Sequence, residues 1–545
     1  MHINSLPVDV LRIILQQTLY TPFTGSESWK HQLPLLSVCS AWRYLAVPIV
    51  YKHMFVVHTC HSPDDERDAG DLASVPAAPT NVNTNMHLVA SNGHASLVRH
   101  AEIKILIGAE PFSGVTSVLC MLRAVCRQWS RINMLTLSLA EEMTPANRGT
   151  NAAPCCRAQI GLVASAMLEL LPGLTGLRFR GYGGGQLVED IYGAIASRYS
   201  GQLAQLVSRR PITLSERLCF GQMTRLDLRV GTVAGYRIPQ VLAGPLVALS
   251  LKSIPANFSW ADFIQDSDAD AIEFPSLAVL SLNYRSGGVR ATGDAAVPSS
   301  HAYGCKMYFP KLHSLHLWNT TGYCPMLASA VLPATMASLD IVGSSGAIAM
   351  LERVRLPEVG RLSLSVTATS PAMQSATLPA LNRIVSKAVV RAEASIIILE
   401  DTIAFDDRGV VWPNLTHLQV AAPTRVDAVV EIVGRLPALV EAVFYSILIE
   451  GIPEEAFLLD GPVAEHTRVR PLNVVLRRLM LDHERSECPE RATAATIKYL
   501  ALALPSLLVL SVWLPLEDDL LSFIDSYKCA YPHLSNIKFR LGAGE

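Results

Sequence analysis

A nine-residue motif recurs along most of this 545-residue chain. It consists of an aromatic residue or leucine, then proline, then leucines spaced as x-L-x-x-L-x-L. Seven close copies are present: LPGLTGLRF from Leu171, FPSLAVLSL from Phe274, FPKLHSLHL from Phe309, LPEVGRLSL from Leu356, WPNLTHLQV from Trp412, LPSLLVLSV from Leu504 and YPHLSNIKF from Tyr531. Looser copies begin at Ile132, Met223, Pro245, Met336, Leu436 and Val474. Recurrence of one short unit restricts the chain to folds in which equivalent units stack.

The distance between equivalent leucines gives the length of the repeating unit. It is 23 residues from Leu226 to Leu249, 24 from Leu315 to Leu339 and 23 from Leu339 to Leu362. Other steps are longer, which indicates inserted loops. These lengths lie within the roughly 20 to 29 residues of leucine-rich repeats, which the motif resembles. The asparagine of a regular leucine-rich repeat has no steady position here, so the resemblance is to a degenerate array.

Each unit is expected to contain a strand, a loop and a helix. The L-x-L stretch has the period of a strand, and the proline before it ends a helix. Residues 426–436, 494–504 and 517–527 show helical spacing just before a copy of the motif, and residues 160–177 divide into a helix and a strand. One unit cannot bury its own apolar face. The predicted fold class is therefore α/β, an irregular leucine-rich-repeat solenoid with parallel strands on its inner face and helices outside.

The first 56 residues have a different, helical pattern. Apolar residues recur at helical spacing over residues 6–15, where a proline in the first turn removes no needed hydrogen bond. A second apolar stripe runs through residues 33–46, and Pro48 is expected to break that period. Two or three small helices should therefore pack together, with Trp42 as the largest side chain in their core.

This N-terminal sequence resembles the F-box, a helical module of substrate receptors in cullin ubiquitin ligases. It contains LPVDVLRIIL from Leu6 and LSVCSAWRYLAVPIVYK from Leu36. The resemblance implies docking on a Skp-type adaptor through eleven residues: Leu6, Pro7, Asp9, Val10, Leu11, Ile14, Leu36, Val38, Cys39, Trp42 and Arg43. In the alternative, these helices only cap the first edge of a larger domain, and the protein is a leucine-rich-repeat interaction scaffold outside any ligase.

Three segments are predicted along the chain. They are an F-box-like helical module over residues 1–56, a loop or linker over 57–98 and a leucine-rich-repeat-like solenoid over 99–545. The linker prediction rests on residues 60–92, which are rich in Asp, Ala, Pro, Asn and Ser and poor in large apolar residues. The two resemblances imply a non-catalytic receptor that binds an adaptor through its helices and a protein substrate through its repeats.

Composition argues against several other classes of protein. Hydrophobic residues make up 50% of the chain and charged residues 17%, as in a folded protein with a large core. The formal net charge is -2, and the arginine pairs at 209–210 and 477–478 are isolated, so no nucleic-acid partner is expected. No leader or membrane-spanning run is found, and a cytoplasmic or nuclear location is expected. The cysteines number 11 and include no C-x-x-C pair, which predicts neither a disulfide framework nor a zinc knuckle.

No catalytic constellation, metal or cofactor is predicted. The chain lacks the P-loop, H-E-x-x-H and G-x-S-x-G motifs, and the glycine run at 181–185 lacks dinucleotide-binding spacing, so it is interpreted as a repeat loop. His53, His58, Cys60 and His61 have the chemistry of metal ligands, but their place at the end of the helical module does not favour convergence. Substrate contacts are expected from residues between the strand leucines: His313, His316, Trp318, Arg178, Arg180, Lys252, Asn283 and Gln419.

Overall fold

The chain forms two compact units, Met1–Ala269 and Asp270–Glu545. The computed structural model describes residues 6–19, 33–59, 81–107, 111–141, 155–181, 186–210, 212, 221–230, 243–254, 271–284, 306–320, 330–344, 357–367, 390–398, 415–420, 424–445, 447–448, 475–482, 499–500, 503–504, 506–513 and 538–541.

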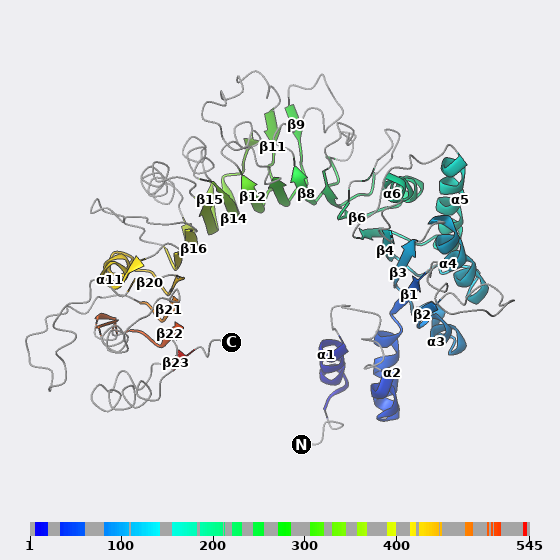
Figure 1. The fold of residues 1–545 in the computed structure, drawn as a ribbon, viewed down its shortest axis with the longest axis horizontal. Coiled ribbons are helices and arrows are strands. Elements are labelled where there is room, and N and C mark those ends of the chain that lie inside the picture. Colours follow the sequence, from blue (N-terminus) through cyan, green and yellow to red (C-terminus); the bar gives the residue numbers. More distant parts are fainter. Residues whose placement is uncertain are drawn as a thin grey trace, which may run out of the picture. The chain divides into compact units, whose positions relative to one another are not determined.

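The first unit contains a mostly parallel sheet with helices α4, α5 and α6 along one side of strands β3 to β6 (Figure 1). Its strands pair in the order β2–β1–β3–β4–β5–β6–β7–β8, and all pairs are parallel except β1–β2. The strands are β1 His53–Thr59, β2 Asn81–Thr84, β3 His100–Ile107, β4 Met134–Glu141, β5 Gly176–Arg180, β6 Gln205–Ser208, β7 Arg225–Arg229 and β8 Ala248–Ile254. The helices are α1 Val8–Leu19, η3 Leu33–Ser37, α2 Ser40–Val50, α3 Met86–Ser91, η5 His94–Leu97, α4 Pro111–Val125, α5 Cys155–Leu170 and α6 Gln186–Tyr199, of which η3 and η5 are 3₁₀ helices.

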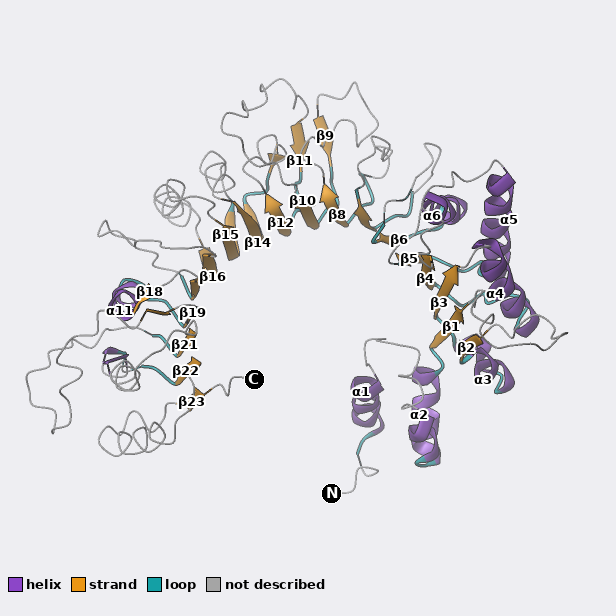
Figure 2. Cartoon of the chain, in the orientation of Figure 1, coloured by secondary structure: helices purple, strands orange, loops and turns teal. Residues whose placement is uncertain are grey.

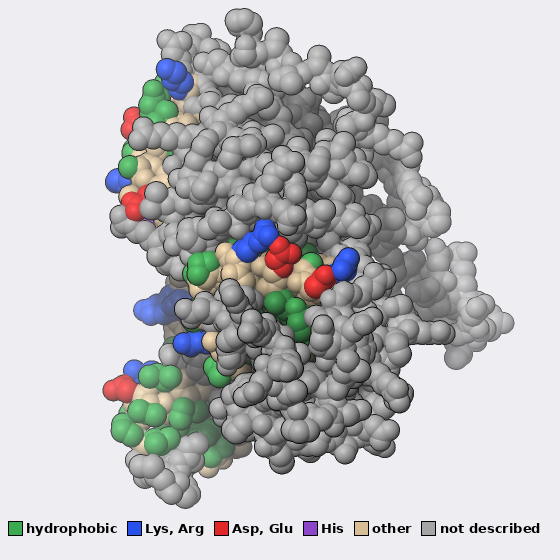
Figure 3. Space-filling view, turned by 90° about the vertical axis from the view of Figure 1, so that its left-hand side faces the viewer, with side chains coloured by type: hydrophobic (Ala, Val, Ile, Leu, Met, Phe, Trp, Pro, Cys, Tyr) green, Lys and Arg blue, Asp and Glu red, His purple; other side chains and the backbone are tan. Residues whose placement is uncertain are grey.

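The second unit contains a parallel sheet in the order β10–β12–β14–β15–β16–β17–β19–β21–β22–β23 (Figure 2). These strands are β10 Val279–Tyr284, β12 Ser314–Thr320, β14 Thr335–Ser344, β15 Glu358–Thr367, β16 Val390–Ile398, β17 His417–Val420, β19 Glu441–Phe444, β21 Arg478–Asp482, β22 Val509–Trp513 and β23 Lys538–Leu541. Smaller parallel groups are formed by β9 Ala271–Glu273, β11 Lys306–Tyr308 and β13 Ala330–Val331, and by β18 Thr424–Arg425 and β20 Ile447–Leu448. The α-helix α11 is Val426–Gly434. Figure 3 shows the side of the molecule that lies on the left in Figure 1, where basic and acidic side chains lie close together.

Every copy of the motif ends in a strand, and the leucines of successive copies lie in register. Leu315 lies opposite Leu339, which lies opposite Leu362, while Leu317 lies opposite Ile341. These five side chains are at most 2% exposed. An equivalent buried column in the first unit consists of Met54, Ala101, Leu135, Leu177, Leu206, Leu226 and Leu249. The prediction of an α/β fold with parallel strands is confirmed.

Backbone hydrogen bonds join each copy to the next at an equivalent position. The carbonyl oxygen of Asn133, just before β4, accepts the N–H groups of Thr175 at 2.9 Å and Gly176 at 2.8 Å. The same pair of bonds recurs at the carbonyls of Lys52, Arg99, Thr175, Ala204, Thr224, Ala278, His313, Thr416, Val440 and Arg477. Because both N–H groups at each strand entry are satisfied by the preceding copy, these bonds fix the register without a repeated asparagine side chain.

Within each of the two units, aromatic rings connect neighbouring elements of the core. Phe274 and Phe309 are the first residues of two copies of the motif, and their rings stack with centroids 5.3 Å apart. In the first unit, Tyr192 of α6 stacks on Phe179 of β5 at 4.3 Å. Its hydroxyl donates to the Arg180 carbonyl oxygen at 2.6 Å and accepts the Leu139 N–H at 2.8 Å. This buried phenol therefore ties α6 to two neighbouring strands.

The predicted linker is wrong for residues 81–97, which form β2, α3 and η5. Strand β1 also begins at His53, inside the segment predicted to be helical, and pairs with β3. The Asn85 side chain explains part of this, since its Oδ1 accepts the Phe55 N–H and its Nδ2 donates to the His53 carbonyl, both at 3.0 Å. Residues 60–80 lie outside the described part of the chain.

The predicted helices have different outcomes. The helix expected over residues 426–436 is confirmed as α11, and the helix and strand expected over 160–177 are confirmed as α5 and β5. Residues 499–500 and 503 of the helix expected over 494–504 are helical, whereas 517–527 lie outside the described residues. Of the glycine run, Gly181 is described; its φ of +149° and a Cβ clash with the Leu139 carbonyl require glycine there.

We predict a large difference between neighbouring residues of β12. Leu315→Ala should lower the free energy of unfolding by about 2 to 5 kcal/mol, because it opens a cavity in the buried column. His316→Ala should cost under about 1 kcal/mol, because this half-buried side chain points away from the leucines and its contact with Asp340, at 3.5 Å, is partly solvated. Urea titration of both variants measures the difference, and equal costs would contradict the strand assignment.

Candidate functional site

Helix α1 separates a buried face from an exposed one. The Pro7 carbonyl accepts the Leu11 N–H at 3.0 Å, so the helix starts directly after the proline. Asp9 lies in the first turn, where its carboxylate interacts favourably with the positive end of the helix dipole. Leu11 and Leu15, one turn apart, are 4% and 1% exposed. They form the core side of α1, which contacts α2.

The other side of α1 presents apolar side chains to solvent. Val10 is 41% exposed and Ile13 is 57% exposed, and they lie three residues apart, on neighbouring turns of one side of the helix. Val8 is 58% exposed. A helix that buries one apolar stripe and exposes another has a surface suited to a partner.

Side-chain hydrogen bonds hold η3 against the start of α2. Cys39 is the N-cap of α2, and its Sγ accepts the Trp42 N–H at 3.5 Å. The Arg43 Nε donates to the Leu36 carbonyl at 2.9 Å, and the Ser37 hydroxyl donates to the Pro34 carbonyl at 2.7 Å. Cys39 and Arg43, predicted from the F-box resemblance, therefore also have a structural role within the chain.

Helix α2 buries fewer large side chains than the sequence predicts. Its buried residues are Leu45, Ala46 and Val50, whereas Trp42, predicted to be the largest side chain of this core, is only half-buried. The helix also continues through Pro48, which was expected to break it. This proline is exposed and close to the helix end, where solvent can replace the missing hydrogen bond.

The sequence-predicted adaptor residues thus divide by exposure. The exposed ones are Pro7, Asp9, Val10, Val38 and Arg43; the half-buried ones are Leu6, Ile14, Leu36, Cys39 and Trp42; Leu11 is buried. Three strongly exposed apolar residues were not predicted, namely Val8, Ile13 and Tyr44, the last 78% exposed. The spacing of Ile13 from Val10 along α1 was the signal that could have identified it. We call the exposed set Pro7, Val8, Val10, Ile13, Val38 and Tyr44 the N-terminal apolar surface.

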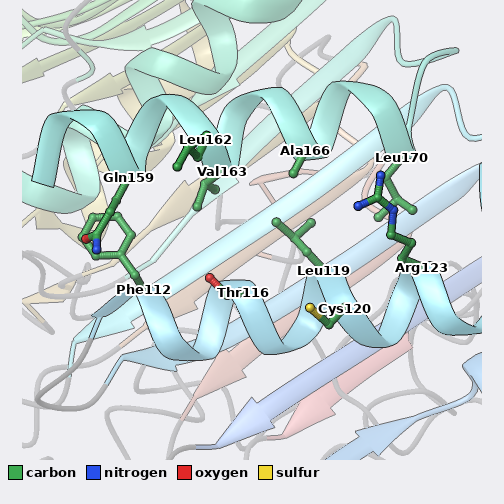
Figure 4. Close-up of a pocket in the computed structure, with 10 residues that line it drawn as sticks. All are labelled: Phe112, Thr116, Leu119, Cys120, Arg123, Gln159, Leu162, Val163, Ala166 and Leu170. Carbon is green, nitrogen blue, oxygen red and sulfur yellow. The ribbon is translucent and has the colours of Figure 1, made fainter.

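A groove of about 340 Å³ lies between α4 and α5 (Figure 4). Its walls are mostly apolar, with Phe112 and Leu162 among the lining side chains. Arg123 at one end pairs with Glu169 at 2.9 Å, and both side chains are about two-thirds exposed, at 64% and 65%. The lining residues include neither an acid paired with a base nor a nucleophile next to a base. The groove therefore has the shape of a binding site but no catalytic group.

Two histidines pack against each other beside the helical module. The Nδ1 atoms of His53 and His100 lie 3.2 Å apart, and His100 Nε2 lies 2.9 Å from the Thr136 hydroxyl. Burial, assisted by the Lys52 charge, lowers the pKa of His53 to about 4. The pKa of His100 is also lowered to about 4, first by burial and then by the charges of four neighbours: His53, Arg178, Arg180 and Lys52.

The residues considered as metal ligands do not form a described site. Cys60 and His61 lie outside the described residues, and His53 faces another histidine. Within the described ranges, no three histidine, cysteine or carboxylate side chains come together as metal ligands would.

The predicted substrate contacts lie where the strands face away from the leucine column, or in the turn before a strand. His313 and Trp318 are exposed, whereas His316, Arg178, Arg180, Lys252, Asn283 and Gln419 are half-buried. In the second unit, Gln419 Oε1 accepts a hydrogen bond from the Tyr445 hydroxyl at 3.1 Å.

Comparison with known proteins assigns no family. No family model matches the chain, and no curated protein matches it. None of the helices in the described ranges is long and apolar enough to span a membrane.

We predict that the histidine pair makes stability depend on pH. Both rings stay neutral in the fold until about pH 4, whereas histidine in the unfolded chain protonates near 6.5. The unfolded chain binds more protons between these values, so stability should fall as pH drops from 6.5 toward 4. Thermal unfolding at pH 7 and pH 5 should show a smaller loss in the double variant His53→Gln, His100→Gln than in the parent. An equal loss would contradict the role of this pair.

Proposed function

We propose that this protein is a substrate receptor of a cullin-type ubiquitin ligase. Residues 6–50 act as an F-box-like module that binds a Skp-type adaptor, and the repeats form a leucine-rich-repeat solenoid that binds a protein substrate. The observation that carries the proposal is the N-terminal apolar surface, because exposed apolar side chains on a small helical module favour a protein partner. The recurring motif with its in-register leucines supports the solenoid.

In this proposal the chain itself makes and breaks no covalent bond. The adaptor and cullin supply the link to the ubiquitin carrier, and the receptor holds a substrate lysine near it. A bimolecular encounter then becomes effectively intramolecular, which raises the rate through proximity. Rigid packing between the module and the first sheet would raise this rate further, because it limits the positions that the substrate lysine can take relative to the ubiquitin carrier.

A scaffold outside any ligase is the second candidate. It is favoured by the close connection of α2 to the sheet, since the carbonyl of Lys52, between α2 and β1, accepts N–H groups of Arg99 and His100 at 2.9 and 3.1 Å. A helical cap would need this connection. It would not need exposed apolar residues such as Val10 and Ile13.

We predict that the double variant Val10→Asp, Ile13→Asp weakens binding of purified Skp-type adaptor by about tenfold or more, because it puts charges into an apolar contact. The matched control is Leu162→Asp on α5, which is 69% exposed and lies outside the N-terminal apolar surface. Adaptor binding is measured by calorimetry on the full chain. Failure of the parent chain to bind adaptor, or unchanged binding by the double variant, would reject the ligase function in favour of the scaffold.

A further inference from the structure

Parallel pairing in the first unit assembles a face of the sheet opposite the buried leucines. One row across the strands consists of Glu102, Thr136, Arg178, Val207, Asp227 and Ser250. Two residues along, Lys104, Ser138 and Arg180 lie side by side, as do Arg229 and Lys252. Arg209 directly follows β6, and its N–H bonds to the Phe179 carbonyl at 3.2 Å, which continues the ladder beside Arg180.

This face concentrates positive charge, although the chain as a whole has a net charge of -2. Its cations are Lys104, Arg178, Arg180, Arg209, Arg225, Arg229 and Lys252, and we call them the basic sheet face. The carboxylates at the same positions are Glu102 and Asp227. Adjacent strands lie roughly 4.8 Å apart, so these cations are near neighbours. The sequence obscures them, because each strand contributes only one or two.

The two carboxylates leave most of this charge unpaired. Asp227 lies 2.9 Å from the Lys252 ammonium, and Glu102 lies 4.0 Å from the Arg180 guanidinium. Arg178 has no hydrogen bond or ion pair with any residue in the described ranges, and the Arg180 Nε is buried without a hydrogen-bond partner there. The Arg178 and Arg180 side chains therefore make no hydrogen bond to any described residue.

The cations of this face repel one another. The pKa of Arg178 is lowered first by burial and then by the charges of Arg180, Arg225 and Arg209, with Asp227 opposing them. In the second unit, by contrast, Arg478 lies 3.8 Å from Glu441, and His316 lies 3.5 Å from Asp340.

We propose that the basic sheet face binds an Asp- and Glu-rich segment of a protein partner, whose carboxylates pair with the guanidinium groups of Arg178, Arg180 and Arg225. The planar fork of arginine matches a carboxylate through two parallel hydrogen bonds. Half-burial strengthens such bonds at Arg178 and Arg180, whereas Arg225 is exposed. If the proposed function holds, this segment belongs to the substrate.

A peptide fits this face better than a nucleic acid. The half-buried carboxylates of Glu102 and Asp227 lie among the cations and would repel a continuous line of phosphates, whereas an acidic segment can place neutral residues opposite them. Single-stranded nucleic acid also needs exposed aromatic platforms. Phe55, which lies opposite Glu102 at the edge of this face, is buried.

The test uses the full chain and a fluorescent 15-residue peptide of alternating Asp-Glu pairs and Gly-Ser spacers. Its anisotropy should report binding that weakens as salt is raised, while the Asn-Gln version should not bind. The double variant Arg178→Gln, Arg225→Gln should weaken binding by roughly tenfold or more, because two charge-assisted contacts are lost. A second pair, Lys104→Gln with Arg209→Gln, should also weaken it, and circular dichroism checks the fold of both.

The matched control is Arg477→Gln, an exposed arginine of the second unit, which should leave peptide binding unchanged. The Val10→Asp, Ile13→Asp variant should also retain it, which separates this inference from adaptor binding. Absence of acidic-peptide binding, or equal binding by parent and both double variants, would overturn the proposal. Tighter binding of a single-stranded oligonucleotide of equal charge, lost in the same variants, would overturn it in favour of a nucleic-acid site.

Discussion

The parallel, in-register pairing of successive repeats is the constraint on which the other features of this protein depend. Side chains alternate between the two faces of a strand, so a single register decides both the core and the opposite surface. With Leu315 opposite Leu339, the leucines form one buried column and His316 must lie beside Asp340. The paired backbone bonds at each strand entry hold this register from copy to copy.

The same constraint explains how residues far apart in sequence form a common surface. Arg178 and Arg180 lie on β5 and Arg225 lies on β7, in another copy of the motif, so only the alignment of β5, β6 and β7 brings them together. The N-terminal apolar surface arises differently, from the local periodicity of α1 and the capping of α2 by Cys39. The proposed receptor would thus bind its adaptor through a surface set by local helix periodicity. It would bind its substrate through a surface set by the pairing of strands from different copies.

Local periodicity was sufficient to predict the strands that end the copies of the motif, and their buried leucines, because each copy contains its own alternation. It could not predict β2, since residues 81–84 contain little apolar surface and become a strand by pairing with β1 and through the hydrogen bonds of Asn85. Spacing placed Trp42 in an apolar stripe, but did not reveal that smaller side chains such as Ala46 would fill the core of α2. The basic sheet face depends on pairing between copies, which no single segment specifies.

Disulfide trapping between neighbouring repeats tests the register most directly. Ser314 and Ser338 are register partners whose hydroxyl oxygens lie 2.8 Å apart. Cysteines at these two positions should oxidise to a disulfide, identified by peptide mass mapping, because neighbouring strands hold their Cα atoms within bridging distance. Cysteines at 314 and 340 are two residues out of register and should remain reduced in the folded chain. Efficient bridging of 314 to 340, with none between 314 and 338, would contradict the parallel register and the surfaces derived from it.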